Sequence, residues 1–226
     1  MESSPMERFN IAIIFDMDGV IVDNHAFHMK AWMQFFNDHG LPLSEQEYKQ
    51  QINGRPLAEI IPKYFGKHFT PAMSRQLGEE KEAAYRELYK DHIVPTPGLV
   101  DFLEILEEKN IPKAIATSAP PANVDFTLQT TGLKKYFPII TDDSMITQGK
   151  PHPEVYLKSA DQLHTPPHRC IVFEDAILGV QAGKNAGMKV VGVATTHPRE
   201  ELENTDYIID NFEKLSLEDL LDKLSL

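Results

Sequence analysis

Short apolar runs alternate with helical patterns along most of the chain. The apolar runs are IAIIF (11–15), KAIAT (113–117), PIIT (138–141), CIVF (170–173), KVVGVAT (189–195) and YIID (207–210). Helical patterns occupy residues 98–110, 121–132, 153–163 and 177–187 between these runs. Continuous apolar runs of this length are typical of parallel strands that are covered on both faces. We therefore predict an α/β fold with a Rossmann-like parallel sheet.

Residues 24–92 break this alternation, because they show helical patterns and no strand pattern. The patterns are NHAFHMKAWMQFFNDHG, SEQEYKQQI and PAMSRQLGEEKEAAYRELYKDH, and the last begins at Pro71, a residue favoured in the first turn of a helix. The proline- and glycine-rich connector IVPTPG (93–98) follows. We predict an inserted all-helical cap domain at 23–93 and a core domain formed by 1–22 and 94–226. Residues Gly19 to Asp23 bound the insertion on its other side, and such a pair of connectors suits a lid.

Composition and charge exclude several classes of function. A chain of 226 residues with 42% hydrophobic content can bury one large core and a smaller second unit. The net charge of −12 and the absence of a Lys/Arg cluster argue against nucleic acid as a partner. No run approaches the ~20 apolar residues that span a bilayer, and the amino-terminal stretch lacks the apolar segment of a signal peptide. The single cysteine, Cys170, cannot form an internal disulfide, so we expect a cytoplasmic protein without a membrane partner. The oligomeric state is open, with a monomer as the default expectation.

The segment FDMDGVIVD (15–23) carries the chemistry, because two aspartates follow the first buried run directly. Sites in open α/β sheets form at the carboxyl ends of the strands, where Glu174 and Asp175 are also predicted to lie. Asp16 could attack a phosphate if a divalent cation neutralised the repulsion between the two anions. Mg²⁺ suits this role, with Asp16 and Asp175 as ligands and Glu174 assisting directly or through water. Asp18 is placed to protonate the leaving oxygen and later to deprotonate water.

Two further residues would supply hydrogen-bond donors for the charge that develops on the phosphoryl oxygens: Thr117, at a strand end, and Lys150, in QGKPHP. Lys150 would also restrain the ionised Asp16. Simpler interpretations exist, since Thr117 or its competitor Ser118 could cap the next helix, and Glu174 with Asp175 could cap another. A calcium loop is excluded, because such a loop needs glycine at position six and glutamate at twelve.

These residues resemble four motifs of the haloacid dehalogenase superfamily in their usual order. The motifs are DMDGV (16–20), Thr117–Ser118, Lys150 in KPHPEVY, and Glu174–Asp175 in FEDAILGVQAGKNAGM. The insertion is similar to the type 1 cap, and DMDGVIVDNHAFHMKAW (16–32) is similar to the β-phosphoglucomutase subgroup. The resemblance implies that Asp16 is phosphorylated and that Asp18 is the acid/base and a metal ligand through its backbone carbonyl. Asp175 and Glu174 would be further metal ligands.

The substrate side of the site departs from the mutases of this subgroup. His28 falls on the cap histidine of the subgroup, and the other candidates for substrate contacts are Asn24, Arg55, Ser118 and Asn123. Mutases carry a Ser–Lys pair where this chain has Ala119–Pro120, and a lysine–glycine pair where it has Asn53–Gly54. These losses favour a phosphatase acting on a small phosphorylated metabolite such as a hexose phosphate. The alternatives are a β-phosphoglucomutase, a pyrophosphatase, or a phosphoacceptor signalling module of the receiver type. An insertion of about seventy residues argues against a receiver, which has no lid.

Overall fold

The computed structural model describes residues 10–53, 55, 57–66 and 70–226, and in this part of the chain the strands form one sheet. The strand order is β3-β2-β1-β4-β5-β6, and every neighbouring pair is parallel. The strands are β1 (Ala12–Phe15), β2 (Lys113–Ala116), β3 (Ile139–Thr141), β4 (Cys170–Glu174), β5 (Lys189–Val193) and β6 (Tyr207–Ile209). The predicted parallel α/β fold is therefore confirmed, with small differences at the strand ends.

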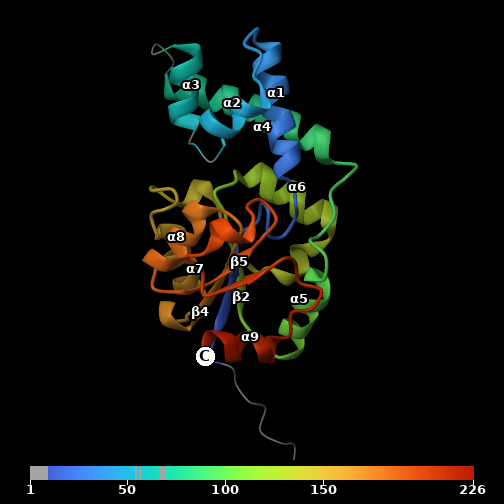
Figure 1. The fold of residues 1–226 in the computed structure, drawn as a ribbon, viewed down its shortest axis with the longest axis vertical. Coiled ribbons are helices and arrows are strands. Elements are labelled where there is room, and N and C mark those ends of the chain that lie inside the picture. Colours follow the sequence, from blue (N-terminus) through green and yellow to red (C-terminus); the bar gives the residue numbers. More distant parts are fainter. Residues whose placement is uncertain (1–9, 54, 56, 67–69) are drawn as a thin grey trace, which may run out of the picture.

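Helices cover both faces of the sheet, as Figure 1 shows. Because successive strand residues point to opposite faces, Ile13 and Phe15 enter one hydrophobic cluster while Ala12 and Ile14 enter another. The first face packs against α5 (Leu99–Glu108), α6 (Pro121–Thr131) and α9 (Leu217–Leu224). The second face packs against α7 (Glu154–Gln162) and α8 (Ile177–Asn185). Burial on both faces explains why the strands are apolar except at their ends. Short 3₁₀ turns complete the core: η1 (Leu133–Tyr136), η2 (Asp143–Met145), η3 (Pro167–Arg169) and η4 (Arg199–Leu202).

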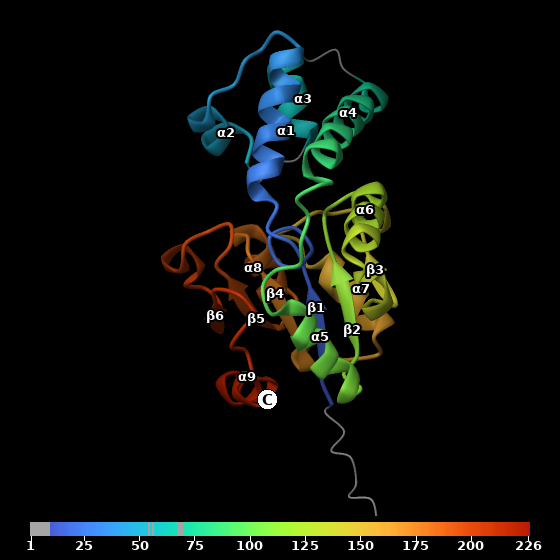
Figure 2. The ribbon, with the colours of Figure 1, turned by 90° about the vertical axis from the view of Figure 1, so that its right-hand side faces the viewer.

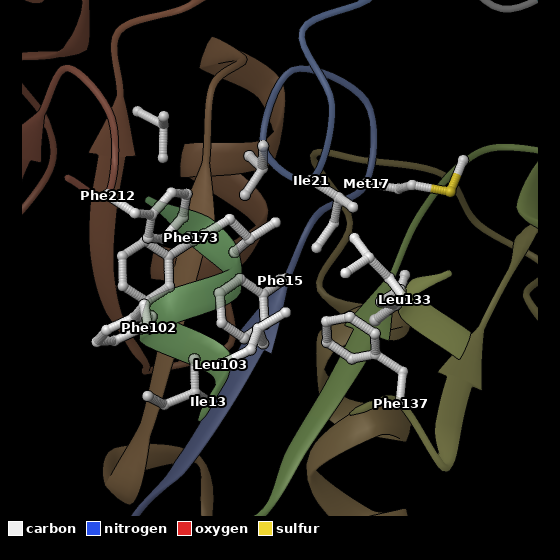
Figure 3. Packing of buried hydrophobic residues seen from close by; sticks show 14 of the residues in the cluster. Ile13, Phe15, Met17, Ile21, Phe102, Leu103, Leu133, Phe137, Phe173 and Phe212 are labelled. Carbon is white, nitrogen blue, oxygen red and sulfur yellow. The ribbon is translucent and has the colours of Figure 1, made fainter. Parts of the chain in front are cut away.

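A group of phenylalanine rings joins the two central strands (Figure 3). Phe15 on β1 pairs in register with Phe173 on β4, and their rings stack with centroids 5.1 Å apart. Phe102 from α5 packs edge-on against both rings, at 6.5 Å from Phe15 and 5.8 Å from Phe173. This packing holds the ends of β1 and β4 side by side, so the residues that follow them emerge together.

The helical insertion lies beyond the carboxyl ends of the strands (Figures 1 and 2). It comprises α1 (His25–Asp38), α2 (Glu45–Gln51), α3 (Leu57–Phe65) and α4 (Pro71–Tyr89). Helix α4 begins as the sequence indicated, with Pro71 in its first turn and the Thr70 side chain accepting a hydrogen bond from the Met73 amide. The insertion has its own buried cluster, which includes Trp32, Phe35, Phe36, Tyr48 and Ile61. An inserted helical cap is thus part of the observed fold, whereas the domain boundaries at 22/23 and 93/94 stay predictions. Residues 1–9 and Gly54 lie outside the described residues.

The cap is joined to the core at the base of α4 and at the turn after β1. Val22 forms isolated bridges with Asp18 and with Pro95, so the two connecting segments run beside each other. The hydroxyl of Tyr89 donates to the backbone oxygen of Asp23 at 3.3 Å.

Among the described residues, none of the helices combines the length and the apolar composition needed to cross a lipid bilayer.

Candidate active site

Three buried carboxylates meet at the carboxyl ends of the two central strands. Asp16 directly follows β1, Glu174 ends β4 and Asp175 comes next, and one oxygen of each lies within 4.8 Å of the others. Lys150, from the loop before α7, reaches the same point, and its Nζ donates to Asp16 Oδ1 and to Glu174 Oε1, each at 2.5 Å. The structure therefore brings together residues that three separate segments of the sequence contribute. The order of the sheet reverses between β1 and β4, which is where ligands bind in open α/β sheets.

Glu174 is held by more than the lysine. The hydroxyl of Tyr156 on α7 donates to Glu174 Oε1 at 2.7 Å, and the backbone amide of Ala176 donates to Oε2 at 3.0 Å. The N-cap of α8 is Ala176, without a side-chain cap bond, so neither Glu174 nor Asp175 acts as the alternative helix cap. Tyr156 was not among the site residues predicted from the sequence, although it lies within KPHPEVY. Its signal was a tyrosine in the helix after the lysine loop, whose hydroxyl needs a partner once buried.

Burial dominates the electrostatics of this cluster. It raises the pKa of Asp16 to about 8, against the opposing effect of Lys150. Burial also raises the pKa of Asp175 well above its usual range, and the neighbouring carboxylates of Glu174 and Asp16 add to the shift. For Lys150, burial alone would lower the pKa, but Asp16 and Glu174 raise it well above the ordinary value. The protein by itself therefore has more negative charge at this point than it can accommodate.

The residues present fit a bound Mg²⁺. Three carboxylates and one ammonium leave two negative charges when all are ionised, which a divalent cation would balance. The donor atoms are all carboxylate oxygens, which Mg²⁺ prefers, and a small number of carboxylates leaves coordination positions for water and substrate. Gly19 allows the loop after β1 to approach, because its φ is +80° and a Cβ there would overlap the Asp175 carboxylate. Coordination through the backbone carbonyl of Asp18 stays a prediction.

Asp18 lies beside this cluster and has partners of its own. The side-chain amide of Asn24 donates to Asp18 Oδ1 at 2.6 Å and to the hydroxyl of Tyr85 at 2.7 Å. The ring of Tyr85, on α4, stacks on the ring of His28 with centroids 3.9 Å apart. Asn24 is 1% exposed, and its side-chain amide is bound to Asp18 and Tyr85. Its role in substrate binding stays a prediction.

His28 connects Asp18 with a buried lysine. Nε2 of His28 lies 3.9 Å from Asp18 Oδ1, and Lys81 Nζ lies 3.2 Å from His28 Nδ1. An ammonium can only donate, so Nδ1 must accept, and in a neutral ring the hydrogen is then assigned to Nε2, which faces Asp18. Burial would raise the pKa of Asp18, but His28, Asn24 and Lys81 together lower it. In the free protein Asp18 is therefore ionised at neutral pH.

Of the other residues predicted from the sequence, Thr117 is buried, whereas Ser118 and Arg55 are exposed. Thr117 is buried at the end of β2, and its Oγ1 accepts from the Ala119 amide at 3.0 Å rather than capping α6. Ser118 is exposed. Arg55 is also exposed, and its Nη1 lies 3.9 Å from Glu59 on α3. Among the described residues, the contacts of Arg55 do not link it to the carboxylate cluster.

Sequence reasoning missed the contribution of α4. Lys81 and Tyr85 are four residues apart and therefore lie on the same face of that helix. Both side chains contact His28. The segment EKEAAYRE around them is rich in charge and is typical of a solvated helix face. The only local signal was a tyrosine and a lysine at helical spacing.

Comparisons with known proteins agree with this geometry. The sequence profile of the haloacid dehalogenase-like hydrolases matches residues 13–193. A phosphorylated carbohydrates phosphatase from Thermotoga maritima is 33% identical over 187 residues, covering 80% of this chain and 84% of that protein. A β-phosphoglucomutase from Bacillus subtilis is 29% identical over 215 residues, covering 92% of each chain. A solved structure of a HAD hydrolase of family IA, variant 3, from Entamoeba histolytica has a TM-score of 0.89 at 30% identity, covering 96% of this chain and 100% of that one. The chain therefore belongs to the haloacid dehalogenase superfamily, as a β-phosphoglucomutase-like member, and is an enzyme of the hydrolase and phosphatase type.

Proposed function

We propose that this enzyme is a Mg²⁺-dependent phosphatase that hydrolyses a phosphomonoester of a small metabolite, a sugar phosphate, with Asp16 as the nucleophile. One observation carries the proposal: Lys150 fixes the buried carboxylate of Asp16 beside Asp175, and Asp18 lies next to it with separate partners. This arrangement separates a nucleophile from an acid/base. The sugar-phosphate phosphatase among the relatives supports the same substrate class.

In the first half-reaction, an oxygen of Asp16 attacks phosphorus while the bond to the leaving alcohol breaks. Asp18 gives its proton to the leaving oxygen. Lys150 and Thr117 supply donors close to the transferring phosphoryl group. When bound, Mg²⁺ would be held by Asp16 and Asp175, with Glu174 shared between Lys150 and the ion, and would neutralise the charge of carboxylate and phosphate. Because the pKa of Asp18 is lowered in the free protein, the substrate must raise it on binding, through its own negative charge and the exclusion of water.

In the second half-reaction, water hydrolyses the aspartyl phosphate. Asp18, now ionised, takes a proton from the water while the water oxygen attacks phosphorus. The bond between phosphorus and the Asp16 oxygen breaks at the same time. Inorganic phosphate leaves and the carboxylate of Asp16 is restored. One residue thus serves as acid and then as base.

The loop after β2 favours hydrolysis over isomerisation. At Ala119–Pro120 the chain has neither a cationic side chain nor, at the proline, an N–H to hold a second phosphate. A mutase must retain its bisphosphate intermediate during turnover, whereas a phosphatase only needs to release an alcohol and admit water.

A phosphate-release screen with Mg²⁺ across sugar phosphates, nucleotides and pyrophosphate tests this proposal. It is run beside an assay for glucose 6-phosphate formed from β-glucose 1-phosphate. We expect phosphate release from sugar phosphates and a loss of at least about a thousandfold in kcat for Asp16→Asn. Asp210→Asn, which changes an exposed surface carboxylate, is the matched control and should keep full activity. Isomer formation without phosphate release would show that the enzyme is a mutase.

A further inference from the structure

Asn123 is a buried polar residue of the core whose side chain is bound entirely by the cap. It lies in the first turns of α6 and is 1% exposed. Its Nδ2 donates to Glu82 Oε2 at 2.7 Å, and its Oδ1 accepts from Arg86 Nη1 at 2.8 Å. Both partners belong to the cap helix α4, which lies over α6 in Figure 2. Both bonds exist only while α4 lies against α6, so they favour a cap that is seated on α6.

The contacts of Glu82 continue toward the catalytic residues. Its second oxygen, Oε1, accepts from Lys81 Nζ at 2.6 Å, so the two oxygens of Glu82 join Asn123 to Lys81. Lys81 is 4% exposed and contacts His28 Nδ1 at 3.2 Å. His28 in turn faces Asp18. A continuous set of polar contacts therefore leads from core helix α6, through the cap, back to the core at Asp18.

We propose that Asn123 is a positioning residue for the acid/base: it orients Glu82, and through Lys81 it fixes the His28 ring that faces Asp18. The inference rests on the proposed function, in which Asp18 protonates the leaving group. Its consequence is that protonation depends on the contact between α4 and α6. A cap that is lifted from α6 loses both bonds to Asn123 and releases Lys81 from its fixed position.

Arg86 offers a matched control for this role. It contacts the same side chain, Asn123, but through the other end of the amide, and its second partner is the exposed Glu79. Changing Arg86 therefore removes one contact between cap and core but leaves the bond from Asn123 to Glu82, through which the set leads to Asp18. If Asn123 only docked the cap, substitutions of Arg86 and Glu82 would have the same effect on catalysis. If Asn123 positions the acid/base, only the substitution of Glu82 would impair protonation of the leaving group.

The test compares two esters that differ in their need for a proton. The nitrophenolate of p-nitrophenyl phosphate leaves without protonation, while the phenolate of phenyl phosphate is more basic and depends on an acid. We expect Asn123→Ala and Glu82→Gln to lower kcat/KM for phenyl phosphate about tenfold more than for p-nitrophenyl phosphate. Arg86→Gln should change both values by the same factor. Because kcat/KM reports the steps up to phosphoryl transfer, hydrolysis of the aspartyl phosphate does not enter the comparison.

An equal loss with both esters in Asn123→Ala and Glu82→Gln would overturn the positioning role while leaving the phosphatase intact. The same would follow if Arg86→Gln showed the leaving-group dependence. Circular dichroism and thermal unfolding establish that each variant is folded, and if Asn123→Ala is not, the comparison of Glu82→Gln with Arg86→Gln decides. If the wild-type enzyme releases phosphate from neither ester nor from any compound in the screen, the proposed function is wrong and this inference falls with it.

Discussion

At the scale of single residues, the site is marked by carboxylates whose ionised forms are disfavoured by burial at the strand ends. Asp16 and Asp175 are 6% and 4% exposed, and burial raises the pKa of both. Lys150 compensates for only part of the negative charge. A folded protein tolerates such groups when they serve a purpose, and strongly shifted pKa values cluster at functional sites for that reason.

The shift at Asp16 predicts how pH changes the stability and the metal affinity of the protein. Its pKa rises from 3.8 to about 8, so between these values the metal-free folded protein binds a proton that the unfolded chain has released. This contribution to stability is fully present below the unfolded pKa and is lost as the pH rises through about 8. A cation needs the ionised carboxylate and competes with that proton. We therefore expect a fixed millimolar concentration of Mg²⁺ to raise Tm more at about pH 9 than at about pH 6.

Thermal unfolding with and without Mg²⁺ at the two pH values measures this effect. Asp16→Asn removes both the proton-binding group and the proposed ligand, so its Tm should respond weakly to Mg²⁺ at either pH. A larger response of the wild-type protein at the lower pH would contradict the prediction.

At the scale of elements, the site depends on how closely the loop after β1 approaches the loop after β4. Gly19 has no side chain, and a Cβ at this position would overlap the Asp175 carboxylate. Gly179 in α8 plays a comparable part, because a Cβ there would overlap the Glu174 carboxylate. Gly183 lies against β5 instead, with Val190 Cγ2 2.8 Å from the position of its Cβ, so it allows the helix to pack closely on the sheet.

Two glycine substitutions separate the shape of the site from backbone strain. Gly19 and Gly132, the latter at the end of α6, both have positive φ, at +80° and +71°, but no atom of the described residues lies within 4 Å of a Cβ at Gly132. Alanine at either position should cost about 1–2 kcal/mol of stability from the left-handed backbone. Only Gly19→Ala should displace Asp175, and we expect it to lower kcat/KM by at least about a hundredfold.

Denaturant unfolding and phosphate release, measured on both variants, check this prediction. Gly132→Ala should keep wild-type activity despite its lower stability. Wild-type activity in Gly19→Ala, or an equal loss in Gly132→Ala, would mean that the approach of the two loops does not determine the geometry of the site.

At the scale of the whole molecule, the apolar interior is divided. Helices α1 to α3 bury their own cluster around Phe35 and Phe36, whereas Tyr85 and Tyr89 of α4 belong to the cluster of the core. Helix α4 therefore ties the cap to the sheet, together with Ala31 and Phe27 of α1, which also belong to or pack against the core cluster. The rest of the cap has its own interior and can lose its structure while the sheet stays folded.

A pair of phenylalanine substitutions tests this division. Phe36 is fully buried in the cap, with its ring centroid 4.8 Å from that of Tyr64, and Phe36→Ala should cost about 3–5 kcal/mol there. We expect faster hydrogen exchange in α1 to α3, unchanged protection in β1 and β4, and loss of phosphatase activity because His28 is no longer held. Phe102→Ala removes a comparable ring from the core and should speed exchange throughout. Faster exchange of the central strands in Phe36→Ala would show that the two interiors unfold as one.

Much of the fold could be predicted because its signals are local. Each strand is a short apolar run whose neighbours in the chain already imply burial on both faces, and the start of α4 is indicated by Thr70 and Pro71 alone. The acidic residues of the candidate site were also predictable where they come at the end of such runs, as Asp16 and Asp175 do. For these positions, the end of a strand and the parallel arrangement are enough to gather them at one edge of the sheet.

The sequence by itself determined the parallel sheet, the helical insertion and the acids at the strand ends, because backbone periodicity and strand ends depend on residues close in the chain. Only the tertiary structure decided which further side chains surround those acids. Tyr156 reaches Glu174, and Lys81 on a charged helix is buried against His28, while Lys90, just after the end of the same helix, pairs at the surface. These contacts arise when separate elements pack together, and no local pattern distinguishes a lysine that will be buried from one that will stay in water.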